Sequence, residues 1–273
     1  MTAMRVGEAL IRLLAEMNVD TVFGIPGVHT VELYRGLEGS SIRHITPRHE
    51  QGAAFMADGY ARVTGKPGVC LLITGPGFTN AITAIAQARA DSVPMLIISG
   101  VNARDTLGRQ EGRLHELPDQ AAMSRTICLE TFTLLQPERL GEMVEQAFEV
   151  MTSGRPGPVH IEIPTDVMGI EIDLPALQQA SPAPPLEPRS SDLEQALVMC
   201  QTATAPLILA GGGVKQAEAL LRLADKLDAP VISTNNARGL MAGHPLDVPA
   251  SPSLRAIRDI IVSADLVLAL GTE

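Results

Sequence analysis

A single glutamate stands near the start of a segment built mainly from small and apolar residues. The segment reads RHEQGAAFMADGYAR at residues 48–62, and its first carboxylate is Glu50. Such a carboxylate can simply benefit from the positive end of a helix dipole. If the small side chains instead allow another helix or subunit to approach, the carboxylate loses solvation and needs a proton or a partner. Glu50 is therefore a candidate for acid–base chemistry.

A second signal is the sequence TGPGFTN at residues 74–80, which follows an apolar run. Proline is favoured in the first turn of a helix, because its missing amide hydrogen would be unbonded there anyway. The segment thus has a purely structural interpretation as a tight strand-to-helix connection. It is a poor phosphate loop, because the lysine of the GxxxxGK[ST] pattern is absent.

The elements around these segments alternate between helix and strand. Continuous apolar runs at 68–74 and 94–100 are typical of parallel strands buried on both faces. Helical periodicity is found at 5–17 and 50–63, among other places. Repeated β-α-β order predicts an α/β fold with a doubly wound parallel sheet. The polar segment 101–120 is expected to be a functional loop.

A proline-rich stretch divides the chain. Residues 175–190 carry five prolines, which is typical of a domain linker. We expect a first domain over 1–174 and an incomplete, Rossmann-like α/β domain over 191–273. The last expected strand, near 266–270, ends almost at the last residue, whereas a parallel strand normally continues into a covering helix. The chain is therefore expected to be the N-terminal part of a longer protein.

Composition narrows the classes of partner. The net charge of −10 argues against nucleic acid and anionic membranes. Neither a signal peptide nor a membrane-spanning run is visible. Three widely spaced cysteines and no i,i+4 histidine pair argue against disulfides and against metal ligands within this chain. A cytoplasmic protein is expected.

Longer stretches around both motifs resemble the pyrimidine-binding domain of thiamine-diphosphate enzymes of the acetolactate synthase group. Besides 48–62, these stretches are VDTVFGIPGVHTVELYRGL at 19–37 and ITGPGFTNAITAIAQARADSVPMLIISG at 73–100. GRPGPVHIEIPTDV at 154–167 resembles the end of that domain. LILAGGGVKQAEALLRLADKLDAPVIST at 207–234 resembles the beginning of the family's central domain. The resemblance therefore extends along essentially the whole chain.

The resemblance implies a thiamine diphosphate site. In the family, a glutamate that matches Glu50 hydrogen-bonds N1′ of the aminopyrimidine and promotes the imino form that removes the C2 proton. In the family, the turn that matches Gly75-Pro76-Gly77 in the second motif lets the backbone approach the pyrimidine, with Asn80 close by. The cofactor-binding candidates are Pro26, Gly27, Glu50, Thr74, Gly75, Pro76, Gly77 and Asn80.

The loop near residue 112 departs from acetolactate synthases, which typically read GTDAFQE there. This chain reads GRLHE at 112–116, which places Leu114 and His115 at the Phe and Gln positions. His115 is either a catalytic acid–base group or a solvated loop histidine. The loop looks closer to the group's 2-oxo acid decarboxylases, including 2-ketoarginine decarboxylases. A 2-oxo acid substrate is expected near Val28, His29 and Leu114.

Two family features are missing. The Mg²⁺ and diphosphate site needs Gly-Asp-Gly followed by Asn-Asn, and no Gly-Asp-Gly occurs here, so these ligands are expected in a C-terminal domain. FAD is not expected, because Gly271-Thr272-Glu273 stands where FAD-binding relatives read Val-Arg-Phe. Gln216 also breaks the dinucleotide glycine pattern that begins at Gly211.

We therefore expect the N-terminal part of a thiamine-diphosphate-dependent 2-oxo acid decarboxylase or carboligase. The resemblance implies a homodimer or homotetramer that associates through the pyrimidine-binding domain and shares its sites between subunits. The 273-residue chain alone is expected to be inactive. The alternative is a non-catalytic pairing or regulatory module that donates Glu50 to a partner chain.

Overall fold

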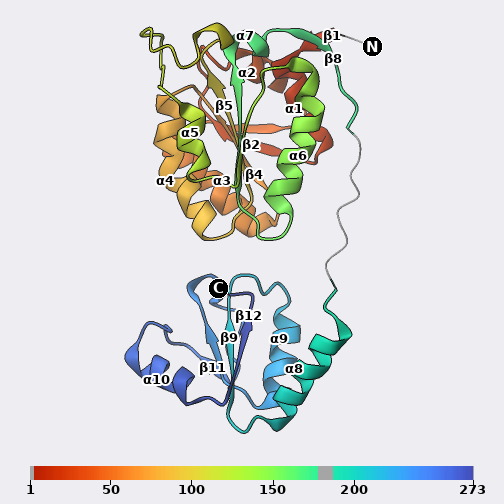
Figure 1. Cartoon of the computed structure of the whole chain (residues 1–273), viewed down its shortest axis with the longest axis vertical. Coiled ribbons are helices and arrows are strands. Elements are labelled where there is room, and N and C mark those ends of the chain that lie inside the picture. The colour runs from red at the N-terminus through yellow and green to blue at the C-terminus, as the bar shows by residue number, and fades with distance from the viewer. Residues whose placement is uncertain (1–2, 178–186, 273) are drawn as a thin grey trace. The chain divides into compact units, whose positions relative to one another are not determined.

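The chain folds into two compact units, Met1–Ala183 and Pro184–Glu273. The computed structural model describes residues 3–177 and 187–272 (Figure 1). Most of the proline-rich linker expected at 175–190 lies outside these residues. Both units are α/β structures with parallel main sheets, which confirms the fold class expected from the sequence.

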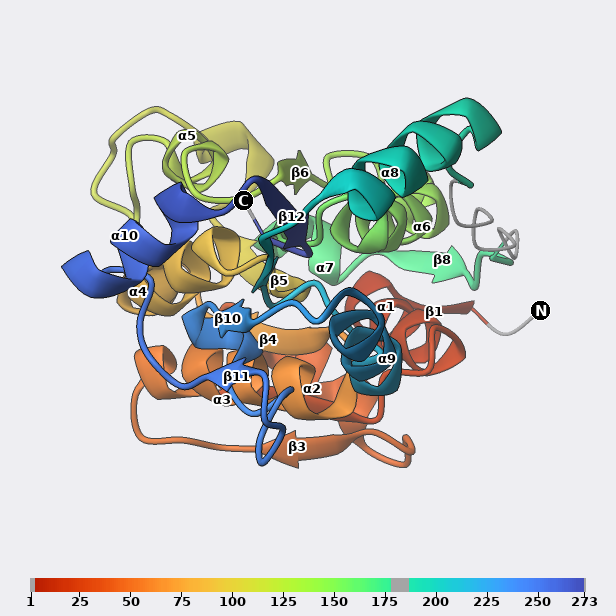
Figure 2. The same cartoon turned by 90° about the horizontal axis from the view of Figure 1, so that it is seen from below.

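A six-stranded parallel sheet forms the centre of the first unit, in the order β3-β2-β4-β5-β7-β6. Figure 2 labels β3, β4, β5 and β6, which follow one another across the sheet in that order. Its strands are β2 (Thr21–Gly24), β3 (Arg43–Ile45), β4 (Gly68–Leu72), β5 (Met95–Val101), β6 (Glu130–Thr133) and β7 (Pro158–Pro164). Every residue of β4, β5 and β7 is buried, as is usual for the central strands of a parallel sheet that is covered on both faces. The edge strand β6 was not predicted, because its sequence ETFT is polar and only half-buried.

Helices cover both faces of this sheet, so it is doubly wound (Figure 1). One face carries α1 (Val6–Glu16), α2 (Val31–Leu37) and α6 (Leu140–Thr152). The other face carries α3 (Glu50–Thr64) and α4 (Pro76–Ala90). The smaller elements are β1 (Ala3–Arg5), β8 (Glu171–Asp173), α5 (Gln120–Arg125), α7 (Thr165–Met168) and 3₁₀ turns at Arg104–Thr106 and Pro137–Arg139. Strands β1 and β8 pair antiparallel.

Small side chains let α3 and α4 approach each other and the sheet closely. The alanines buried in this layer are Ala53, Ala54, Ala57, Ala61, Ala81, Ala84 and Ala88. A Cβ on Gly68 would lie 2.2 Å from the carbonyl oxygen of Ala57, so β4 contacts the α3 backbone directly. This packing fixes the starts of both helices. In a parallel sheet they lie with the other β-α loops at the carboxyl edge, where ligands of such folds bind.

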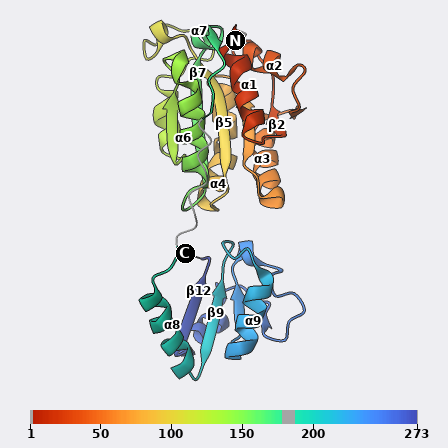
Figure 3. The same cartoon turned by 90° about the vertical axis from the view of Figure 1, so that its right-hand side faces the viewer.

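The second unit has a four-stranded parallel sheet in the order β11-β10-β9-β12. Its elements are α8 (Ser190–Thr202), β9 (Pro206–Ala210), α9 (Ala217–Leu227), β10 (Val231–Ser233), a 3₁₀ turn (Asn235–Ala237), β11 (Asp247–Val248), α10 (Arg255–Ser263) and β12 (Leu266–Leu270). Strands β9 and β12 lie side by side (Figure 3). The two-residue β11 was not predicted, because it is too short to show a periodicity. Across the described parts of both units, no helix combines the length and apolarity that a bilayer span demands.

Candidate functional site

Glu50 is the first residue of α3 and is half-buried. The preceding His49 caps the helix, because its Nδ1 accepts a hydrogen bond of 3.1 Å from the amide of Gln51. The Glu50 Oε2 accepts a hydrogen bond of 2.8 Å from Asn80 Nδ2, in the first half of α4. Thirty positions separate these two residues in the sequence, and the close packing of their helices joins them. The carboxylate thus has a fixed partner and an open side.

The turn from β4 into α4 is a bare stretch of backbone beside Glu50. Gly75 has φ +60° and ψ −104°, and a Cβ there would lie 2.1 Å from the carbonyl oxygen of His115. A Cβ on Gly77 would lie 2.5 Å from Ile73 Cγ2 and 3.8 Å from Glu50 Cγ. Pro76 begins the helix, as predicted. Both glycines are therefore required by the packing, and the turn carries little side-chain cover.

Two buried polar atoms lie next to this turn without a hydrogen-bond partner among the described residues, namely Thr74 Oγ1 and His29 Nδ1. Gly100 brings their residues together, because a Cβ there would lie 2.7 Å from Thr74 Oγ1 and 3.1 Å from the His29 carbonyl oxygen. A buried polar group without a partner costs about 1–3 kcal/mol.

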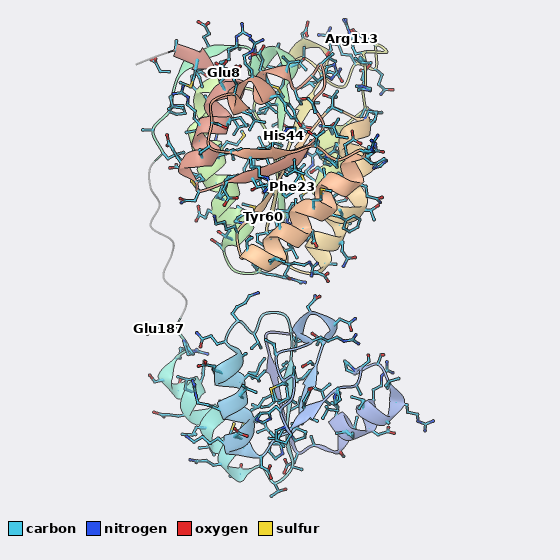
Figure 4. All side chains as sticks on the ribbon, turned by 180° about the vertical axis from the view of Figure 1, so that it is seen from behind. Glu8, Phe23, His44, Tyr60, Arg113 and Glu187 are labelled. Atoms are coloured by element: carbon cyan, nitrogen blue, oxygen red, sulfur yellow. The ribbon has the colours of Figure 1, made fainter. Side chains whose placement is uncertain are left out.

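The rings of His29 and His115 meet edge to face, with centroids 5.8 Å apart at 79°. Burial, and then the charge of His115, lower the pKa of His29. His115 has φ +58°, an uncommon conformation outside glycine that histidine tolerates better than most residues. The loop that carries it, together with Arg113 (Figure 4), is anchored where Asn102 Nδ2 donates a 3.0 Å hydrogen bond to the Leu114 carbonyl.

The structure thus gathers most of the predicted site residues at one place. Glu50, Asn80 and the glycine turn form one group, and the His29–His115 pair joins it through the contact of His115 with Gly75. The remaining predicted residues are more accessible to solvent. Pro26, Gly27 and Val28 line a cavity of about 490 Å³ together with Val31, Tyr34 and Arg35. Leu114 is 57% exposed, an unusual setting for a large apolar residue.

One residue of the site was not predicted. Gln120, the first residue of α5, is 3% exposed, and its Oε1 accepts a 2.8 Å hydrogen bond from the Gly75 amide. Its only sequence signal was its place at the end of the polar segment 101–120.

Residues 3–177 and 187–272 contain no group of three His, Cys, Asp or Glu side chains that could hold a metal ion.

Comparison with known proteins identifies the class to which this arrangement belongs. Residues 4–123 match the N-terminal TPP binding domain of thiamine pyrophosphate enzymes, and residues 193–273 match the central domain of the same enzymes. Thiamine pyrophosphate is another name for thiamine diphosphate. The chain therefore belongs to the thiamine pyrophosphate enzyme family, as its sequence motifs predicted.

Individual relatives narrow the comparison. The chain is 51% identical over 271 residues to a probable 2-ketoarginine decarboxylase of Pseudomonas aeruginosa, covering 98% of this chain and 48% of that protein. It is 36% identical over 274 residues to the acetolactate synthase isozyme 1 large subunit of Escherichia coli, covering 97% and 48%. It is 34% identical over 280 residues to the chloroplastic acetolactate synthase of Arabidopsis thaliana, covering 97% and 41%. The chain thus spans about half the length of these relatives or less.

Proposed function

We propose that this chain supplies the pyrimidine-binding half of a thiamine diphosphate site in a 2-oxo acid decarboxylase or carboligase. The observation that carries the proposal is the Glu50–Asn80 pair beside the bare Gly75–Gly77 turn. Similarity to a probable 2-ketoarginine decarboxylase and to acetolactate synthases supports the reaction class. The higher identity to the former favours decarboxylation of a 2-oxo acid such as 2-ketoarginine.

The residues present fit the aminopyrimidine of the cofactor. Glu50 would hold and exchange a proton at N1′, and its hydrogen bond to Asn80 would fix the orientation of the carboxylate. The backbone of Gly75 and Gly77 would lie against the ring, where side chains leave room. When bound, thiamine diphosphate supplies the electron sink that decarboxylation of a 2-oxo acid requires. The ligands of its diphosphate and Mg²⁺ would come from another domain.

The histidine pair is proposed to handle protons on the substrate side, with His115 as the acid–base group. Val28, His29 and Leu114 would surround the 2-oxo acid. His29 carries the clearest electrostatic signal, because burial and then the nearby His115 disfavour its charged form. At neutral pH a His29 with a lowered pKa is uncharged, so it can accept a hydrogen bond or a proton.

This electrostatic arrangement predicts a measurable shift. The pKa of His29, followed by NMR titration of its ring protons, should lie below the usual 6.5. His115→Gln removes the second cause of the shift and leaves burial, so the pKa of His29 should rise toward 6.5 without reaching it. A pKa of His29 that does not move in His115→Gln would contradict the coupling.

We propose that the first unit associates with a second copy through the outer face of α3. That face carries two glycines and three exposed apolar side chains, namely Gly52, Phe55, Met56, Gly59 and Val63. A Cβ on Gly59 would meet nothing within 4 Å, so a second helix could approach the backbone closely. Exposed apolar surface on a helix that also carries Glu50 supports an interface next to the site.

The proposed association can be tested by introducing one charged side chain into this face of α3. Met56 is 44% exposed, and Met56→Glu should convert the protein from a dimer or tetramer toward monomers in sedimentation velocity, because an unpaired carboxylate is costly in an apolar interface. Val262→Glu on α10, where Val262 is 83% exposed, is the matched control and should sediment like the unmodified protein. A Met56→Glu protein that keeps the parental oligomeric state would rule out this face.

The activity itself is tested with the whole protein that carries this sequence. A panel of 2-oxo acids that includes 2-ketoarginine is incubated with and without thiamine diphosphate and Mg²⁺, and CO₂, aldehydes and carboligation products are measured. Release of CO₂ that depends on the cofactor is the expected result. If no member of the panel reacts, the proposed function is wrong. The purified 273-residue chain is the comparison, and turnover by it would contradict a site shared with another domain.

A further inference from the structure

A buried polar network lies against the Gly75 turn, and Gln120 is at its centre. The Oε1 of Gln120 accepts the hydrogen bond from the Gly75 amide at 2.8 Å. Its Nε2 lies 3.1 Å from Ser99 Oγ, 3.0 Å from the Gly100 carbonyl oxygen and 3.0 Å from Glu162 Oε2. One side chain therefore connects the β4–α4 turn to the carboxyl ends of β5 and β7.

The partners of Gln120 fix the orientation of its amide. The Gly75 amide can only donate and the Gly100 carbonyl can only accept, so the oxygen must face Gly75 and the nitrogen must face Gly100. Glutamine is the side chain of this length that offers an acceptor at one end and two donors at the other. An ionised glutamate would place a second acceptor against Gly100 and a like charge near Glu162.

The rest of the network is buried and holds Gln120 in place. Ser99 Oγ lies 2.8 Å from His160 Nε2, and Glu162 Oε1 accepts a 2.7 Å hydrogen bond from Thr133. Burial lowers the pKa of His160 to about 3, so its ring, which stacks on Phe78, is neutral. Burial also raises the pKa of Glu162. The remaining charged groups nearby, Asp119 and Arg125, are exposed and lie 3.5 Å apart.

We propose that Gln120 is a positioning residue, which sets the Gly75 turn against the cofactor pyrimidine and ties the loop of His115 to that turn. The inference rests on the proposed function. Gly75 is held from two sides, by the Gln120 hydrogen bond and by the His115 carbonyl against its α-carbon. Gln120 also ends the loop that carries His115, and α5 begins there. Loss of the hydrogen bond frees the turn beside the Glu50–Asn80 pair.

Two substitutions separate positioning from simple core packing. Gln120→Leu removes both ends of the amide and should lower kcat about tenfold or more at every pH. Gln120→Glu keeps the shape. When protonated, the introduced carboxyl offers one acceptor to Gly75 and one donor to Gly100, and when ionised it offers acceptors only. Its kcat relative to the unmodified protein should therefore fall as pH rises. Burial and Glu162 should place this fall above the usual range of a glutamate.

A second readout does not depend on turnover. In protein labelled with ¹⁵N-glycine, the Gly75 amide resonance should shift in Gln120→Leu and should return in Gln120→Glu at low pH. Thr131→Val is the control, because it removes another hydrogen bond of the network, the 2.9 Å contact of Thr131 Oγ1 with Ser124 Oγ. Ser124 Oγ lies 2.9 Å from His160 Nδ1, whereas Ser99 Oγ contacts Nε2 on the other side of the ring. Thr131→Val should therefore leave the Gly75 resonance and kcat unchanged.

The outcomes distinguish this inference from the proposed function. If the unmodified protein does not decarboxylate any 2-oxo acid, the proposed function and the inference both fail. Suppose instead that the unmodified protein is active, that Gln120→Glu has the same pH profile as the unmodified protein, and that the Gly75 resonance does not shift in Gln120→Leu. The inference alone is then wrong. If Thr131→Val loses as much activity as Gln120→Leu, Gln120 is only part of a stable core and the positioning role is also overturned.

Discussion

Glu50→Gln is expected to lower kcat for 2-oxo acid decarboxylation by about 10²–10⁴-fold, the usual contribution of a positioned acid–base group. Glutamine fits the same space, and its Oε1 can still accept the hydrogen bond from Asn80 Nδ2. It cannot take up and return a proton at the aminopyrimidine. The start of α3 should lose only a few tenths of a kcal/mol, because the lost charge interacts mainly with the helix dipole.

The matched control is Glu218→Gln. Glu218 is also a glutamate in the first turn of a helix, α9, and its side chain is 92% exposed. Both variants lose a helix-dipole interaction, and Glu218→Gln also loses an exposed 3.9 Å ion pair with Arg222, which contributes little. Thermal unfolding should therefore change little in either variant. Only Glu50→Gln should lose activity in the decarboxylation assay. Full activity of Glu50→Gln would mean that the carboxylate serves the helix alone and that the proposed role of Glu50 is wrong.

The parts of the fold that were predictable from the sequence are those with a strong apolar pattern. The strands β4 and β5 are largely apolar and buried throughout, so their residue types alone mark them. Strand β7 is also buried throughout, although His160 and Glu162 interrupt its apolar residues. The edge strand β6 lacks this pattern, because its side chains are only partly covered. Its pairing with β7 is a long-range interaction that a local sequence window does not contain.

The residues of the candidate site also fall into those that the sequence predicted and one that it did not. Glu50 and Asn80 were predicted because their segments resemble known motifs, and the structure joins them by a hydrogen bond. Gln120 was not predicted, because its role comes from where α5 begins relative to the turn at Gly75. A buried glutamine and a solvated one look the same in a single sequence. What distinguishes Gln120 is the set of fixed donors and acceptors around it.

The geometry of Gly75 predicts the second large effect. Gly75→Ala should lower kcat by about 100-fold or more, because even a displacement of about 1 Å in a catalytic arrangement has that consequence. The introduced Cβ would meet the His115 carbonyl oxygen at 2.1 Å, so either the turn or the histidine loop must move. The backbone of Gly75, with φ +60° and ψ −104°, also lies outside the left-handed helical region, so a residue with a side chain is strained there.

Gly65→Ala is the control for a glycine of positive φ at which a new side chain causes no collision. Gly65 ends α3 with φ +72°, and a Cβ there would meet nothing within 4 Å. This variant should therefore lose only the conformational term, which corresponds to a decrease in Tm of about 2–8 °C, and should keep its kcat. Gly75→Ala should lose more stability and most of its activity. A Gly75→Ala protein that keeps the kcat of Gly65→Ala would mean that the contact with His115 is unimportant for activity.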